Sequence, residues 1–167
     1  ENILMIPIIG IQNTMATFAG QNMGARQPER VSKGLGQGVL VSLFMTAALC
    51  VCQFLGMELI IRAFKLDAAA AAICRQHLFA SVLSEPIFAI YFPANGMFQG
   101  VGEGFHATFY ALMALGLRVV FAYSLYRTAF FGYTAIWWSQ AMAWTLTLIT
   151  CYAHFFRGKW KDKSLIS

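Results

Sequence analysis

Two charged side chains, Glu85 and Arg118, stand within otherwise apolar stretches of the sequence. A charge near the middle of a lipid bilayer costs about 2.5–3.5 kcal/mol on insertion scales, so it needs a partner, a water-filled cavity or neutralisation. Loss of water disfavours an ionised carboxylate and a nearby guanidinium favours it, so a balanced pair can bind and release a proton or Na⁺. We therefore predict that Glu85 binds a cation and that Arg118 is its ion-pair partner. The alternative is a static ion pair that joins two helices.

Two prolines follow the candidate carboxylate, Pro86 directly and Pro93 seven residues later. Each proline removes a backbone donor and favours a kink, so both are predicted to be hinge positions. The segments on either side of residues 96–104 are expected to form an antiparallel hairpin. Glu85 and Arg118 then differ in height by about 5 Å, at about 1.5 Å per residue, which an arginine side chain can span.

The remaining reactive side chains form no predicted catalytic or metal site. Cys50 and Cys52 are two residues apart, so in a helix they point to nearly opposite sides. Glu85 and His77 are eight residues apart, which separates them by about 12 Å along a helix. A membrane-embedded hydrolase would need several such groups at one depth, so we predict no enzyme, no metal and no cofactor beyond a bound H⁺ or Na⁺. The histidines are interpreted as interfacial residues, with proton gating by His106 as the alternative: His77, His106 and His154.

The elements that must position these residues are long and apolar. Hydrophobic residues make up 59% of the 167 residues and charged residues 11%, against about 45–50% and about 25% in soluble domains. No charged residue occurs between Gly34 and Met57 or between Thr128 and Phe156. A helix of about 24 residues is about 36 Å long and crosses a hydrocarbon core of about 30 Å. The alternative, a buried helix of a soluble protein, seldom needs more than about 14 apolar residues.

We therefore predict an all-α fold, a polytopic membrane bundle that lies in the lipid bilayer and has no soluble domain. Lys and Arg number seven on the side of the first connection and the tail, and four on the opposite side. The positive-inside rule then places the first connection and the tail in the cytoplasm. Basic residues lie on both sides, so a nucleic-acid partner is not expected. Membrane helices are expected at residues 3–20, 37–61, 71–94, 105–126 and 133–156, followed by a tail at 157–167.

The connection after the first predicted helix carries a polar motif, AGQNMGARQPERVSKGL. Glycine permits the left-handed conformation that ends a helix, and Gln or Asn can satisfy the freed backbone groups. The helix is therefore expected to end at Gly20, with Pro28 in the first turn of a new short helix. A second stretch, NGMFQGVGEG, is expected to be a tight turn rather than a nucleotide-binding loop, because no strand precedes it and the final x-x-G is missing.

These motifs resemble those of the multidrug and toxic compound extrusion (MATE) family of secondary transporters. The first is similar to the family's G-Q-N-x-G-A signature with its later arginine, and the second to the motif after the family's tenth helix. A third stretch, FFGYTAIWWSQAMAW, resembles the start of the family's last helix. The matching positions are Gly20, Gln21, Asn22, Gly24, Ala25 and Arg30 in the first motif, and Asn95, Gly96, Gln99, Gly100 and Gly102 in the second.

The resemblance implies that the predicted helices correspond to the eighth to twelfth of a twelve-helix transporter. The chain is then expected to be a partial C-terminal transmembrane lobe, whose partner is a missing N-terminal half. The resemblance also implies a multi-pass protein of the plasma membrane that exchanges H⁺ or Na⁺ for small organic cations or drugs by alternating access. In that mechanism Glu85 would be the coupling carboxylate. The alternative is a flippase for lipid-linked precursors from the same superfamily.

Overall fold

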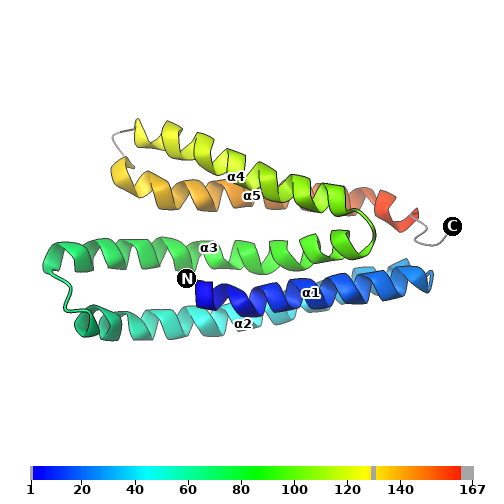
Figure 1. The fold of residues 1–167 in the computed structure, drawn as a ribbon, viewed down its shortest axis with the longest axis horizontal. Helices are drawn as coiled ribbons and strands as arrows, with labels where there is room; N and C mark the ends of the chain where they lie inside the picture. The colour runs from blue at the N-terminus through cyan, green and yellow to red at the C-terminus, as the bar shows by residue number, and fades with distance from the viewer. Residues whose placement is uncertain (1, 129–130, 163–167) are drawn as a thin grey trace.

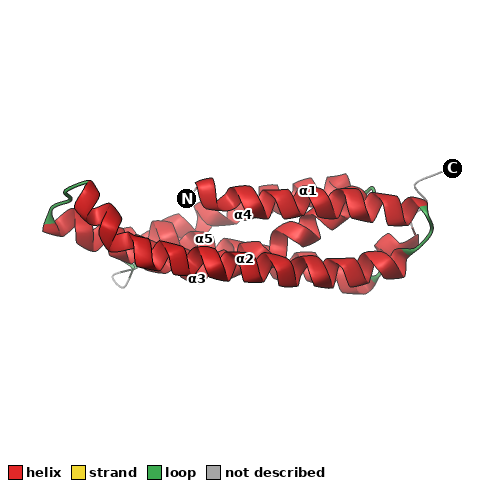
Figure 2. Cartoon of the chain, turned by 90° about the horizontal axis from the view of Figure 1, so that it is seen from below, coloured by secondary structure: helices red, strands yellow, loops and turns green. Residues whose placement is uncertain are grey.

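The computed structural model describes residues 2–128 and 131–162, and almost all of them are helical (Figure 1). Two short 3₁₀ helices, η1 (Gly132–Thr134) and η2 (Lys159–Asp162), flank the last long helix. Figure 2 shows that short connections join the helices, and the described residues include no strand. The predicted all-α class is confirmed. The long helices are α1 (Asn2–Gly24), α2 (Pro28–Ala63), α3 (Ala68–Gly100), α4 (Gly104–Tyr126) and α5 (Ala135–Arg157).

Helix α3 lies at the centre of the bundle and packs against each of the other four long helices. In Figure 1, α4 and α5 lie on one side of it and α1 and α2 on the other. The connection between α1 and α2, the turn between α3 and α4 and the short helix η2 all lie at one end of the molecule. We call this the C-terminal end of the bundle.

Three of the helices in the described part of the chain are long and apolar enough to cross a membrane: α2, α3 and α4. At about 1.5 Å per residue, the 36 residues of α2 and the 33 of α3 reach about 54 and 50 Å. Both therefore extend beyond a hydrocarbon core of about 30 Å. Helices α1 and α5 do not meet this criterion of length and apolar composition. That they cross the membrane stays a prediction.

The first helix boundary differs from the prediction. Helix α1 continues to Gly24, four residues beyond the predicted end, and α2 begins directly at Pro28 with no separate short helix. Arg26 has a positive φ of 56°, and the Gln27 N–H donates to the Asn22 carbonyl at 2.8 Å, which closes the turn. Proline is pre-organised for the first helical position and lacks an N–H that would remain unbonded there, so Pro28 starts α2 itself.

The predicted turn at residues 96–104 was also placed too early. Helix α3 continues to Gly100, six residues beyond the predicted end, and only residues 101–103 separate it from α4. Within this turn Gly102 has a φ of +80°, a conformation that glycine adopts without steric cost. The first part of the predicted turn, residues 96–100, therefore belongs to α3, and only Gly102 serves as a turn glycine.

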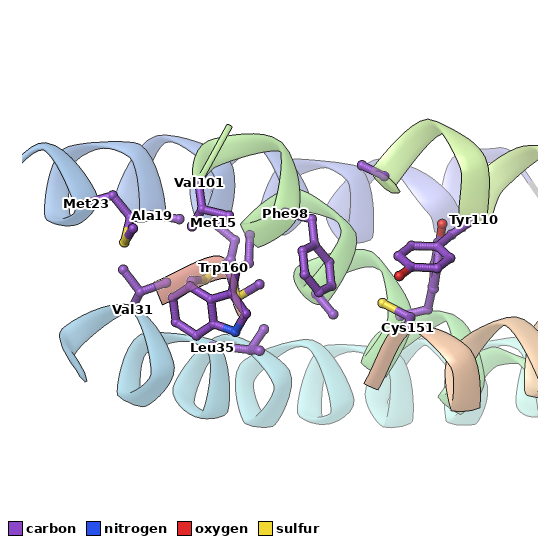
Figure 3. Packing of buried hydrophobic residues seen from close by; sticks show 14 residues of the cluster. Met15, Ala19, Met23, Val31, Leu35, Phe98, Val101, Tyr110, Cys151 and Trp160 are labelled. Atoms are coloured by element: carbon purple, nitrogen blue, oxygen red, sulfur yellow. The ribbon is translucent and has the colours of Figure 1, made fainter. Parts of the chain in front are cut away.

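The buried hydrophobic residues gather toward the C-terminal end of the bundle (Figure 3). Trp160 of η2 is fully buried in this cluster together with Val31 and Leu35 of α2, and its ring stacks on Phe155 at 5.6 Å. Lys161 extends the contact by an ion pair to Glu29 at 3.0 Å. The first residues of the predicted tail therefore fold back onto the bundle, where Trp160 is a core residue. The later part, residues 163–167, lies outside the described residues.

Candidate functional site

Glu85 lies close to the middle of α3 with only 7% of its surface exposed. Its carboxylate faces α2, where the Cys50 thiol donates to Oε2 at 2.9 Å and the Gln53 amide nitrogen donates to Oε1. Both donors are uncharged. A buried carboxylate that has only neutral donors is a favourable ligand for a proton or a small cation, because neutralisation removes the cost of burying the charge.

Arg118 is not the partner that the sequence predicted. It is exposed on α4 and lines a small cavity with Ser84, and within the described residues it forms no ion pair with Glu85. Successive residues of a helix point about 100° apart. Ser84 therefore faces α4 while Glu85 faces α2. The sequence predicted the height of Arg118 along α3 adequately, since it lies near Ser84. It did not predict that Arg118 lies on a different side of α3 from the Glu85 carboxylate.

Both prolines lie inside α3, which continues through them. Pro86 has no N–H to donate to the carbonyl of Val82 four residues earlier. The Cys50 sulfur lies 4.0 Å from that carbonyl oxygen, but its single S–H donates to Glu85, whose Oε2 is closer at 2.9 Å. Pro93 is buried, whereas Pro86 is exposed. The hinge role of the two prolines stays a prediction.

The signature residues from Gly20 to Arg30 form the end of α1 and its connection to α2. Asn22 is 8% exposed, and its side-chain amide donates to the Phe18 carbonyl at 2.8 Å. Arg30 donates to the side-chain oxygen of Gln27 at 3.0 Å. The first bond lies within the last turns of α1, and the second lies at the start of α2. Three further signature residues are exposed: Gln21, Gly24 and Ala25.

Asn95 is the centre of a buried hydrogen-bond network that joins three helices. Its side-chain oxygen accepts from the Gln12 amide of α1 at 2.9 Å and from the Gln99 amide at 2.7 Å. Its side-chain nitrogen donates to the Tyr91 hydroxyl at 2.8 Å and to the Ala107 carbonyl of α4 at 2.9 Å. An amide side chain has two donor hydrogens and two acceptor sites, so all four are used.

The glycines around Asn95 allow α1 and α3 to approach closely. A Cβ atom on Gly96 would lie 2.2 Å from the Gln12 carbonyl oxygen, and one on Gly100 would lie 2.1 Å from the Ala16 carbonyl oxygen. On the other helix, a Cβ on Gly20 would lie 3.3 Å from the Gly100 carbonyl oxygen. Small residues four apart are typical of close helix crossings in membranes. The two sequence motifs therefore pack against each other.

A cavity of about 650 Å³ opens between α2, α3 and the start of α5. Aromatic rings supply much of its lining, including Phe54, Phe79 and Trp137. The cavity shares the α2–α3 interface with Glu85, because the lining residue Phe54 follows Gln53 and the lining residue Val82 lies one turn before Glu85. Glu85 itself is not among the residues that line this cavity.

The structure also brings together three side chains that the sequence analysis did not connect. Glu103, in the turn between α3 and α4, meets His106 of α4 and His154 of α5 at the C-terminal end of the bundle. The spacing of Glu103 and His106, E-x-x-H, was visible in the sequence and could have indicated this pair. His154 lies 48 residues further along the chain than His106, so only the pairing of α4 with α5 brings it there.

Comparison with known proteins agrees with this architecture. The sequence model of the MatE family matches residues 1–124, about three quarters of the chain. The chain belongs to the MatE family. The match runs from α1 almost to the end of α4, so it includes the signature connection, Glu85 and the Asn95 network. The predicted family is confirmed.

The fold is also that of a known membrane protein. The structure is similar to a solved one entitled "Outward-facing conformation of a multidrug resistance MATE family transporter of the MOP superfamily", with a TM-score of 0.83 at 16% sequence identity. The alignment covers 97% of this chain and 36% of that chain, so this MatE chain spans about a third of the length of that transporter. Among curated proteins, none matches the sequence. The predicted all-α membrane bundle is confirmed, whereas the assignment to the eighth to twelfth helices stays a prediction.

Proposed function

We propose that this MatE chain is part of a cation-coupled exporter of small organic cations, with Glu85 as the residue that binds the coupling H⁺ or Na⁺. The observation that carries the proposal is the burial of Glu85 near the middle of a membrane helix, where two neutral groups, the Cys50 thiol and the Gln53 amide, donate to its carboxylate. Ionisable residues at that depth are costly and mark ion pathways. Arg118 has no part in the proposed cation site.

The proposed exchange uses the interface between α2 and α3. When the cation neutralises Glu85, the cost of the buried charge is removed. The hydrogen bonds from Cys50 and Gln53 to the carboxylate then become weaker. The balance between two packings of α2 against α3 then depends on the bound cation, which is the requirement for alternating access. Pro86, one residue after Glu85, gives α3 a weakened backbone ladder at which it can bend.

The substrate class is proposed from the neighbouring cavity. Its aromatic lining, with Phe54, Phe79 and Trp137, suits flat organic molecules, and ring faces attract cations. Arg75 also lines the cavity, but its charge is paired with Glu58 at 2.8 Å. A second half of the transporter is proposed to complete the cavity wall, since this chain spans 36% of the similar transporter chain.

The test is ion-driven efflux by the full-length protein in proteoliposomes. A gradient of H⁺ or Na⁺ is imposed, and release of a fluorescent organic cation is measured for the unchanged protein and for Glu85→Gln. We expect the variant to lose about tenfold or more of the gradient-driven rate, because loss of a charged ligand removes at least about 1.4 kcal/mol of cation binding. Glu29→Gln, an exposed carboxylate, is the matched control and should keep the rate.

The assay also separates the alternatives. Unchanged transport with an unchanged ion dependence in Glu85→Gln would remove Glu85 from coupling. The alternative function is a flippase for lipid-linked precursors. It would be supported if the protein moves no organic cation under either gradient but translocates a lipid-linked precursor in the same vesicles.

A further inference from the structure

Glu103, His106 and His154 converge at the C-terminal end of the bundle, well away from Glu85. One carboxylate oxygen, Glu103 Oε2, lies 3.2 Å from His154 Nε2 and 3.7 Å from His106 Nδ1. The three ligand atoms all lie within 4.8 Å of one another. A tetrahedral zinc ion with bonds of about 2.0–2.1 Å separates its ligand atoms by about 3.3 Å. The observed spacing is therefore close to that of a zinc ligand set.

We propose that Glu103, His106 and His154 form a binding site for a divalent transition-metal ion of the zinc class. Two imidazoles and one carboxylate are a common set of three protein ligands at zinc sites that keep one position open. Glu103 comes from the turn between α3 and α4, His106 from the first turn of α4 and His154 from the last turn of α5. A bound ion would thus join the ends of three helices.

The surroundings of His154 orient it for this role. Its Nδ1 lies 2.7 Å from the Tyr110 hydroxyl, and its ring stacks on Phe98 at 4.9 Å with an interplanar angle of 12°. When Nδ1–H donates to the hydroxyl oxygen, the lone pair of Nε2 points to Glu103. Histidines that bind metals usually donate their other ring N–H to such a partner, which fixes the tautomer and the ring orientation.

The burial of Glu103 is a second argument. Its side chain is 4% exposed, whereas those of His106 and His154 are 44% and 16% exposed. Glu103 occupies the N-cap position of α4, but its carboxylate makes no capping hydrogen bond there. A divalent ion at this position would add positive charge beside the buried carboxylate, which favours its ionised form.

The open position of the site faces a cavity of about 420 Å³. His106 and His154 line this cavity together with Tyr110, Arg157 and Lys159. The two basic side chains oppose a free cation, but they favour an anionic fourth ligand such as hydroxide or a carboxylate. The metal and its fourth ligand would therefore bind together.

The experiment titrates the purified full-length protein with Co²⁺, whose visible absorption reports its coordination, and then displaces it with Zn²⁺. We expect one Co²⁺ per chain without the thiolate charge-transfer band that cysteine ligands produce, and a rise in melting temperature with Zn²⁺. Glu103→Gln and His106→Ala should weaken binding by about 100-fold. Tyr110→Phe, which removes only the orienting hydroxyl, should weaken it by about tenfold.

The matched control is His77→Ala, since His77 is the remaining one of the three histidines in these 167 residues, lies outside the cluster and packs edge-on against Trp137. It should bind Co²⁺ as the unchanged protein does. Each variant is first shown to elute as a single species in size-exclusion chromatography. If a ligand variant does not fold, Tyr110→Phe still tests the proposal. Absence of saturable metal binding would overturn the proposal, as would binding that Glu103→Gln and His106→Ala leave unchanged. A cluster that takes up protons but no metal overturns it as well.

Discussion

Asn95 uses every hydrogen-bonding group of its amide, and its partners belong to α1, α3 and α4. We predict that Asn95→Leu lowers the free energy of unfolding in detergent by about 1–3 kcal/mol, because buried partners such as the Ala107 carbonyl lose their bond. The melting temperature measured by fluorescence checks this prediction. Asn13→Leu, at an exposed position of α1, is the control and should change little. Equal melting temperatures for the two variants would show that the network contributes no stability.

At this scale the sequence indicated which residues are unusual but not what they contact. Glu85 could be singled out because an acid in an apolar stretch is visible without a structure, and the structure shows that it is buried. Its role in cation binding stays a prediction. Its partners Cys50 and Gln53 lie 35 and 32 residues away, and only the packing of α2 on α3 selects them over Arg118. Similarly, His154 carries no local signal, because its role depends on a residue of a different helix.

At the scale of elements, the glycines that were predicted to turn the chain instead bring two helices together. We predict that Gly96→Ala and Gly100→Ala each destabilise the protein by about 1–3 kcal/mol, because the added methyl group would meet the backbone of α1 and the helices must move apart. Gly116→Ala on α4 is the matched control. A Cβ there has nothing within 4 Å, so the change should be neutral or stabilising, as Ala is the better helix former.

Thermal unfolding of the three glycine variants in the same detergent checks this prediction. The prediction is wrong if Gly96→Ala and Gly100→Ala have the same melting temperature as Gly116→Ala.

The existence of the five helices was predictable from apolar length alone, but their ends were not. Gly and Asn at residues 95–100 read as a turn by local propensity. The tertiary contact with α1 makes the same residues favourable within α3, and no local pattern reports that contact.

For the whole molecule, the sequence predicts an orientation in which the C-terminal end of the bundle faces the cytoplasm. The structure brings the basic residues of this end together, because the α1–α2 connection and the start of the tail lie side by side and Lys161 pairs with Glu29. Lys33 belongs to the second turn of α2, which begins at this end, and Arg127 directly follows α4, which ends at the opposite end. Both residues are exposed. By the positive-inside rule, the end that holds more Lys and Arg stays in the cytoplasm.

We therefore predict that a membrane-impermeant maleimide labels Arg127→Cys in intact cells but labels Lys33→Cys only after permeabilisation. Both variants are made in the full-length protein with its own cysteines replaced, since Cys52 is exposed. Labelling of a denatured sample shows that each new thiol can react. The reverse pattern would place the α1–α2 connection outside. The Glu103–His106–His154 cluster would then meet the metal ions of the external medium rather than those of the cytoplasm, because it lies at the same end of the bundle as Lys33.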